Sequence, residues 1–400
     1  MAEEKKKKKK PYEEIEEELF YIILLYYGML HDNALYEINN WLYYAYIVKN
    51  YREYQLSRKN QLYSRLKNNI NTIINKVITP RINDVVDRTT AVEKSILKET
   101  LKQQTEESKK LLLDGAIELF ENSTNQIADM LKQNKENLDK VKSAILKQVE
   151  INDENGIKVV VTKGGNKWGY KEYMEMATRT AVHNALVEYQ LKQGKKQNQV
   201  FYICNVFGDC AYDHLNYQGL IYYDKNYASF NLSAEELARI KSIINSKKLV
   251  SYQDISDGTI TLVLPSGKVR GVLLCTRCNC RHRMFPITID DAENKTAEEL
   301  VNEKKIKKGT YRDDAYMLSQ ELRKVERTIR KFKFHLRQLE SFTKQEGVTS
   351  ILNKKMNKCK TILRRLDLKA NEIVKESKGN LKRNPLREDQ DVFDISWLNE

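Results

Sequence analysis

The sequence has few of the residues that interrupt helices. Only 15 of its 400 residues are glycine and 5 are proline, and these two residue types commonly mark turns and chain breaks. This scarcity argues against an architecture built mainly from short strands and tight turns. A mostly helical chain is therefore expected.

Long apolar runs and a secretion signal are also missing. The apolar run from Leu19 to Leu30 is too short to span a bilayer. Lys5 to Lys10 could open a signal peptide, but glutamates precede the apolar run and no small-residue cleavage site follows. We expect a protein with no membrane span, made in a reducing cytoplasm, whose cysteines are free thiols or metal ligands rather than disulfides.

Positively charged residues outnumber negatively charged residues in the chain. The formal net charge is +14 at pH 7 and 41% of the residues are hydrophobic, which gives enough apolar material for two or three domains. The positive balance favours contact with nucleic acid, an anionic membrane or an acidic protein. A genome biased toward lysine and asparagine is the competing explanation.

The strongest periodicity lies near the C-terminus. Apolar residues from Leu322 to Leu339 are spaced alternately by three and four, and the pattern repeats from Leu352 to Leu366 beyond Gly347. This spacing predicts an antiparallel helical hairpin. Leu131, Leu138 and Ile145 recur every seven residues and predict a coiled-coil-like seam.

Short β-like runs occur only in the middle of the chain, between Ile157 and Leu274, and Tyr170 to Gln193 predicts a helix closed by Gly194. The fold class is α+β, with predominantly helical arms and a C-terminal helical hairpin around a small central domain that contains Cys and His clusters. We divide the chain into a disordered basic arm (1–11), an aromatic-rich helical domain (12–90), a long helical segment (91–150), an α+β core (151–300), a basic hairpin (301–376) and a tail (377–400).

Two Cys/His clusters lie about sixty residues apart, at Cys210 to His214 and at Cys275 to His282. Zinc is bound by thiolate and imidazole donors from two short segments, so a zinc site is one interpretation. The expected ligands are Cys210, His214, Cys280 and His282, with Cys204, Cys275 and Cys278 as alternates. Reduced cysteines packed as small apolar residues are the alternative. No local protease signature and no P-loop accompany the clusters.

A row of arginines lies beside the apolar seam of the first hairpin helix. Residues 301 to 340 contain twelve Lys/Arg and six Asp/Glu, and Arg323, Arg327, Arg330 and Arg337 stand at helical spacings. Such a stripe could follow the phosphates of a nucleic acid. A solvated helix face paired with nearby glutamates is an equal alternative.

Three stretches resemble signatures of the minor capsid (minor head) proteins of tailed bacteriophages, related to Mu-type head-morphogenesis proteins. The first, Tyr170 to Thr180, contains Met176, Arg179 and Thr180; the second, Asp209 to Tyr222, contains Asp213, Gln218 and Gly219; the third, Thr276 to His282, contains Asn279 and Arg281. They occur in the family's order. Cys278 departs from the proline that is usual there, which puts any family-wide metal assignment in doubt for this chain.

The resemblance implies a structural component of the virion, made in the host bacterial cytoplasm and acting in head assembly and in DNA packaging or delivery near the portal. The expected partners are portal or major capsid proteins and packaged double-stranded DNA, with self-association through the helical arms. No catalytic residues are expected. A DNA-binding accessory virion protein with a zinc-stapled core is one alternative. A genome-delivered, ADP-ribosyltransferase-like enzyme is another, although the chain shows no ordered Arg, Ser-Thr-Ser and Glu-x-Glu series.

The motif residues also suggest local roles. Arg179 could form bidentate bonds with Asp213 or a backbone carbonyl. Gln218 and Gly219 are expected to form the turn into a strand, where glycine permits close backbone approach. Arg281 is expected to face away from Cys280 and His282 if this segment is extended.

Overall fold

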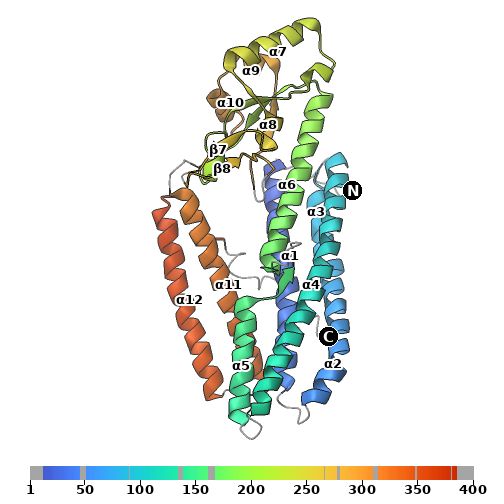
Figure 1. Ribbon diagram of the computed structural model, residues 1–400, viewed down its shortest axis with the longest axis vertical. Coiled ribbons are helices and arrows are strands. Elements are labelled where there is room, and N and C mark those ends of the chain that lie inside the picture. Colours follow the sequence, from blue (N-terminus) through green and yellow to red (C-terminus); the bar gives the residue numbers. More distant parts are fainter. Residues whose placement is uncertain are drawn as a thin grey trace, which may run out of the picture.

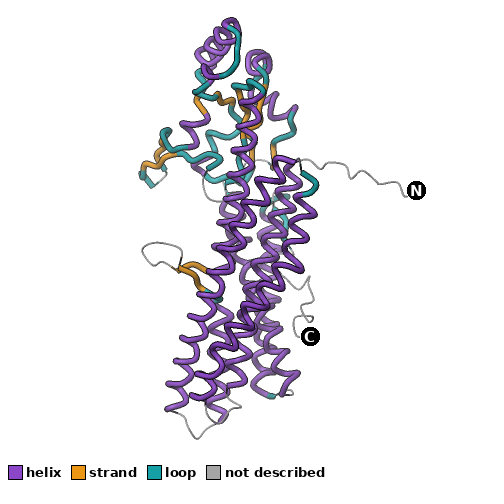
Figure 2. Tube along the Cα trace, turned by 90° about the vertical axis from the view of Figure 1, so that its right-hand side faces the viewer, coloured by secondary structure: helices purple, strands orange, loops and turns teal. Residues whose placement is uncertain are grey.

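The protein is elongated in the computed structural model, with a long helical body that carries a small α+β module at one end (Figure 1). The helices of the body run close to the long axis, as Figure 2 shows from the side. The expected combination of helical arms and a small α+β region is confirmed. The structure describes residues 12–45, 51–89, 91–133, 138–160, 167–264, 266–276, 280–309, 314–346, 349–379 and 381–384; the basic arm and residues 385–400 of the tail lie outside these ranges.

Six α-helices form the body around one hydrophobic core. Aromatic residues from distant parts of the chain meet in this core, since Tyr26 and Tyr43 of the N-terminal segment and Tyr170 are all fully buried. The core joins segments that the sequence analysis assigned to separate domains. The helices are α1 (Tyr12–Ala45), α2 (Tyr51–Ile73), α3 (Thr79–Val86), α4 (Ala91–Gln133), α5 (Leu138–Asn155) and α6 (Tyr170–Lys196).

A π-helical turn precedes Thr79 and Pro80. This turn, η1 (Ile74–Ile78), connects α2 directly to α3. Pro80 stands in the first turn of α3, where its missing N–H has no helical partner to lose. The chain therefore changes its helical register here without leaving the bundle.

A short hairpin joins α5 to α6 on the side of the body. Its strands, β1 (Lys158–Val160) and β2 (Lys167–Gly169), are antiparallel, and β1 packs on α4. A Cβ atom at Gly115 of α4 would lie 2.5 Å from the carbonyl oxygen of Lys158. Glycine is thus required where the hairpin backbone meets the helix.

Helix α6 carries the chain from the body into the module. It continues through Gly194 to Lys196, so the expected closure at Gly194 is wrong by two residues. The glycine instead makes room for a neighbour, because a Cβ atom there would lie 2.7 Å from the hydroxyl oxygen of the buried Tyr202. Its role is packing rather than capping.

The module is built on a four-stranded sheet in the order β6-β5-β3-β9. Strand β3 is central, antiparallel to both β5 and β9, and all four of its residues are buried. The strands are β3 (Phe201–Cys204), β4 (Val206–Phe207), β5 (Ile221–Tyr223), β6 (Val250–Ser251), β7 (Thr261–Val263), β8 (Val269–Gly271), β9 (Met284–Ile287) and β10 (Lys307–Lys308). The helices are η2 (Tyr212–His214), η3 (Tyr227–Ser229), α7 (Ala234–Lys247), α8 (Tyr252–Ser256), α9 (Ile289–Asn294) and α10 (Ala297–Glu303).

The predicted helical hairpin is present as α11 (Ala315–Glu346) and α12 (Ser350–Glu376). Its half next to the turn joins the core of the body, where Phe342 stacks on Tyr43 with ring centroids 3.9 Å apart. Its other half has a separate core that includes Leu322, Ile329 and Ile373. Helix α12 packs mainly on α11 and forms the outer edge of the molecule in Figure 1.

Candidate metal centre

The two Cys/His clusters meet at one end of the sheet. His214 ends the short helix η2, while Cys280 and His282 lie on the extended segment that leads into β9. The end of this segment next to β9 is held by Asn205: its side-chain oxygen accepts a hydrogen bond from the Arg283 N–H at 2.9 Å, and its own N–H donates to the Arg283 carbonyl at 3.3 Å. The pairing of β3 with β9 therefore extends to the site.

Three buried side chains converge there with metal-binding atoms. The Sγ atom of Cys280 lies 3.5 Å from Nδ1 of His282 and 3.8 Å from Nδ1 of His214, and the three residues can each place one ligand atom within 4.8 Å of the others. Tetrahedral zinc with ordinary Zn–S and Zn–N bond lengths separates sulfur and nitrogen ligands by about 3.5 Å. The observed spacing fits that geometry.

Gln218 fixes the orientation of one imidazole. Its side-chain nitrogen donates to the Phe207 carbonyl at 3.2 Å, and its side-chain oxygen accepts from the Phe207 N–H at 2.8 Å. The same oxygen lies 3.0 Å from Nε2 of His282, so Nε2 must carry the proton. Nδ1 of His282 is then the basic nitrogen, and it faces Cys280. Metal-binding histidines commonly donate their second ring nitrogen in this way.

Burial favours the uncharged forms of Cys280 and His282. It raises the pKa of the Cys280 thiol to about 12, and it lowers the pKa of His282 well below its ordinary value, with the neighbouring His214 as the next cause. Both shifts follow from the cost of placing charge in a dry environment. A metal ion bound here would displace the thiol proton.

Of the four expected ligands, Cys210 does not join the other three. Cys210 and His214 would share one face of a continuous helix, but Ala211 between them is extended and the helical turn begins only at Tyr212. Cys210 is buried in the preceding turn, and burial raises the pKa of its thiol to about 11.

The alternate ligands Cys204 and Cys275 are buried in the core beneath the sheet, where their side chains share a hydrogen bond. Both are close enough to influence the ionisation of their neighbours, since Cys204 acts on the pKa of Cys280 and Cys280 on that of Cys275. Cys278 and Asn279 lie outside the described residues.

The family-motif residues surround this group. Arg281 points away from the ligands, donates to Asp209 at 2.6 Å and covers the Phe207 ring at 4.5 Å. Asp209 also accepts a hydrogen bond from Ser319 of α11, at 3.5 Å, which connects the module to the hairpin. Gly219 has a positive φ of 67°, and its missing Cβ leaves space for Val206.

Other motif residues lie on adjoining elements. Asp213 is buried and lies 3.6 Å from Arg270 of β8. Met176, Arg179 and Thr180 are partly buried on α6, and the Thr180 hydroxyl lies 4.0 Å from the sulfur of Met176.

The sequence analysis missed His183, one turn beyond Arg179 on α6. The His183 ring is buried and hydrogen-bonds to backbone groups of Cys275 and His282. Burial is the main cause that lowers its pKa to about 4. His183 thus attaches the first motif stretch to the third. The sequence feature that could have identified His183 was its position on the same predicted helix as the first motif stretch.

The arginines of the predicted nucleic-acid stripe do not form one exposed row. Arg323, Arg327 and Arg337 are partly exposed, whereas Arg330 is only 2% exposed. Arg330 faces the interior, where its charge helps to lower the pKa of Glu172 to about 2 against the opposing effect of burial.

These features define an elongated, helix-rich α+β protein with a buried Cys/His group at the edge of its sheet. The family described as Phage minor capsid protein 2 matches residues 78–366, from the end of η1 to the second half of α12. The chain belongs to this family and is a component of the phage virion. Searches of curated proteins and of solved structures gave no significant match. No helix in the described part of the chain combines the length and hydropathy that crossing a membrane requires.

Proposed function

We propose that this minor capsid protein acts in head assembly and in DNA packaging or delivery near the portal. The supporting observation is that the family match covers α3 to α6, the α+β module and most of the hairpin, and leaves out α1 and α2. The module is therefore matched together with much of its helical support. The helical body would contact portal or major capsid proteins and further copies of the chain, and basic surfaces would contact double-stranded DNA.

The dimensions of the body suit a connecting role. Helix α4 has 43 residues, which corresponds to a length of about 65 Å. A helix of that length, packed along one continuous core with α1 and α6, can hold two contact sites far apart at a fixed distance. Such a protein can connect the capsid shell to the structures around the genome.

A phage with a conditional stop codon in this gene tests the proposal. Particles made without the protein should include fewer DNA-filled heads, counted by electron microscopy and by nuclease-protected DNA, and a plasmid copy should restore them. Filled and infectious heads in its absence would overturn the proposal. Transfer of label from NAD to a host protein by the purified chain would instead favour the enzyme alternative.

We also propose that the α+β module holds one zinc ion through His214, Cys280 and His282. The donor set and the 3.5 Å and 3.8 Å spacings support this assignment. Cys204, Cys275 or Cys278 would supply a fourth ligand. The ion would connect η2 to the segment before β9 and so stabilise a module with short strands.

Elemental analysis and thiol titration on the purified chain test the zinc site. One zinc per chain is expected in the wild-type protein, with additional reactive thiols after chelation. Cys280→Ser and His282→Gln should lose the metal, whereas Cys359→Ser, which changes a buried cysteine of the hairpin, should retain it. Metal-free wild-type protein, or full zinc in both site variants, would overturn the assignment.

A further inference from the structure

Helix α12 has one face in the hairpin core and an opposite face that is mostly basic. Leu352, Cys359, Ala370 and Ile373 are buried against the rest of the protein. On the other side, the charged residues from position 353 to position 369 include Asp367, whose side chain is 47% exposed and paired with Arg383 at 2.7 Å, and six exposed basic residues. These basic residues are Lys354, Lys358, Lys360, Arg364, Arg365 and Lys369.

Most of these cations are not neutralised by a neighbour. Lys358 lies 3.8 Å from Glu150, and Lys369 lies 2.8 Å from Glu321. The other four, which we call the α12 cation set, form no ion pair with an acidic side chain of the described residues. They are Lys354, Lys360, Arg364 and Arg365.

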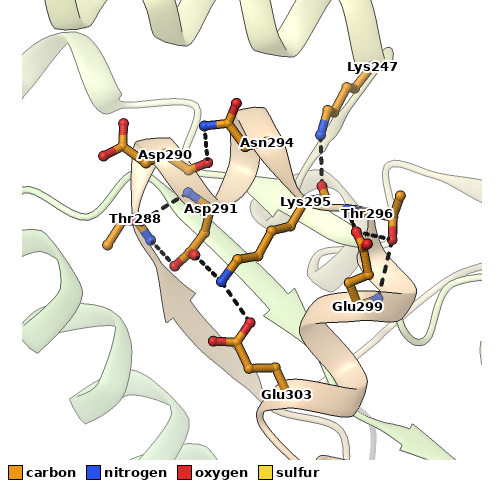
Figure 3. A network of polar contacts seen from close by, with 9 residues as sticks. All are labelled: Lys247, Thr288, Asp290, Asp291, Asn294, Lys295, Thr296, Glu299 and Glu303. Carbon is orange, nitrogen blue, oxygen red and sulfur yellow. Dashed lines mark hydrogen bonds and ion pairs between the residues drawn. The ribbon is translucent and has the colours of Figure 1, made fainter.

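Some cations on the surface of the α+β module are held in ion pairs. Lys295 lies between Asp291 at 2.9 Å and Glu303 at 2.7 Å, as Figure 3 shows. Arg239 of α7 is likewise paired with Asp290 at 2.6 Å. Other exposed lysines of the module, such as Lys241 and Lys304, form no ion pair with an acidic side chain of the described residues, so what distinguishes α12 is the clustering of its unpaired cations on one helix face.

We infer that the outer face of α12 binds the phosphate backbone of double-stranded DNA, an inference that rests on the proposed function. At 3.6 residues per turn, the α12 cation set covers a little over a third of the helix circumference, and Lys354 to Arg365 extends about 17 Å along the axis. Flexible cations distributed in this way can each approach a phosphate and release counterions.

An acidic protein is a poorer match for this face. Protein interfaces have well-packed cores enriched in aromatic residues and depleted of lysine. The outer face of α12 has a single large apolar residue, Leu368, among its exposed positions from 353 to 369. DNA needs no such apolar centre, because phosphate contacts supply most of nonspecific binding.

The structure also favours α12 over the stripe predicted on α11. Arg330 is buried, and Arg327 and Lys331 line a cavity of about 360 Å³ between α11 and the body, together with Asp32 and Glu172. These α11 cations lie next to carboxylates. In the described part of α11, the exposed lysines without an ion pair are Lys324 and Lys344, which are twenty positions apart, whereas the α12 cation set lies within twelve positions.

Salt-dependent binding to a random-sequence duplex tests the inference in the full chain. The test variant replaces Lys354, Lys360, Arg364 and Arg365 with alanine, which keeps helix propensity high. The control variant replaces Lys102, Lys110, Lys196 and Lys241, four exposed lysines of α4, α6 and α7. Both variants lose the same charge and keep the basic arm. Circular dichroism melting verifies that each variant is folded.

The test variant should bind at least tenfold more weakly at 0.1 M salt, with a log–log salt slope shallower by about 3 to 4, because each phosphate contact contributes about 0.9 to the slope. The control variant should retain most of the wild-type slope. Equal losses in the two variants would overturn the α12 assignment and leave the proposed DNA contact intact. No DNA binding by the wild-type chain would overturn both. Unchanged DNA binding with loss of the test variant from purified heads would identify an acidic protein as the partner.

Discussion

The Nε2 atom of His31 accepts a hydrogen bond from the backbone N–H of Ile157, 126 positions further along the chain, at 3.0 Å. The other ring nitrogen, Nδ1, lies 2.8 Å from a carboxylate oxygen of Asp32 and donates to it. These two contacts require a neutral imidazole with its proton on Nδ1. They also attach α1 to the start of the β1–β2 hairpin.

Protonation of His31 should destabilise the protein. Burial and the positive charge of Lys171 lower its pKa to about 4, although Asp32 and Glu172 act in the opposite direction. Between pH 6.5 and pH 4 the unfolded chain therefore binds a proton that the folded chain does not, and stability falls as the pH falls. The loss from His31 between pH 6.5 and pH 5 should be roughly 1 to 2 kcal/mol.

A His31→Gln variant tests this pH dependence. Glutamine can still accept the Ile157 hydrogen bond but does not titrate, so its unfolding free energy should fall less steeply with decreasing pH than that of the wild type. Urea unfolding at pH 7, 6 and 5 measures both slopes. Parallel slopes for the two proteins would show that His31 does not contribute.

The helical architecture could be predicted from the sequence because local patterns determine it. The three-and-four spacing from Leu322 to Leu339 defines the inner face of α11 without reference to the rest of the chain. The β7–β8 hairpin around Ser266 and Gly267 could be predicted for the same reason. Contacts between distant segments could not be derived in this way. Arg330 is buried because the carboxylate of Glu172, 158 positions earlier, lies near it, and no local pattern contains that information.

The candidate metal centre was predictable only in part. The motif windows identified His214, Cys280 and His282, but the four-residue spacing of Cys210 from His214 is misleading because Ala211 is extended. The role of Gln218 depends on the tertiary approach of its side chain to the Phe207 backbone. The family resemblance marked Gln218 as a motif residue, but no local pattern indicates that its side chain orients His282.

Gln218→Ala should weaken the module and its metal site. The substitution removes the partners of the Phe207 N–H and of His282 Nε2, while the Phe207 carbonyl keeps its hydrogen bond from the Cys210 N–H at 3.3 Å. Each buried polar group left without a partner costs about 1 to 3 kcal/mol. We expect a loss of about 2 to 4 kcal/mol in urea unfolding, since the side chain is only half-buried. Loss of such an orienting contact lowers metal affinity about 10- to 100-fold.

Competition with a coloured zinc chelator measures the change in affinity. Gln197→Ala is the control, because Gln197 is exposed at the C-terminal end of α6 and its substitution should change stability by less than about 0.5 kcal/mol. If Gln218→Ala unfolds at the same urea concentration as the control and binds zinc equally well, the orienting role is wrong.

Phe342→Ala should loosen the half of the hairpin that packs on the body. Phe342 and Tyr43 are both fully buried and stack with an interplanar angle of 4°. Truncating a buried phenylalanine costs about 3 to 5 kcal/mol. The other half of the hairpin retains its own core around Ile329 and Ile373.

Hydrogen exchange measured by mass spectrometry resolves the two halves of the hairpin. Peptides near residues 334–346 should exchange faster in Phe342→Ala, and those near residues 318–330 should change less. Leu368→Ala is the control in the same hairpin, since Leu368 is 65% exposed and should cost less than about 0.5 kcal/mol. A uniform increase along both helices would show that the hairpin unfolds as one unit.

Gly194→Ala distinguishes a packing glycine from an ordinary helical one. In an exposed helix the change should stabilise the protein by up to about 1 kcal/mol, because alanine has the higher helix propensity. Here the new Cβ atom would lie 2.7 Å from the hydroxyl of Tyr202, a fully buried side chain that also hydrogen-bonds to the carbonyl of Gln199 at 3.2 Å. Overpacking of this kind typically costs about 1 to 3 kcal/mol, which exceeds the gain in propensity.

The double variant Gly194→Ala with Tyr202→Phe separates these two effects. Removing the hydroxyl removes the closest contact, so the alanine substitution should cost less in the Tyr202→Phe background than in the wild type. Unfolding free energies of the four proteins give this coupling directly. Stabilisation by Gly194→Ala in the wild-type background would contradict the packing role. Gly194 would then be an ordinary helical glycine whose replacement by alanine raises helix propensity.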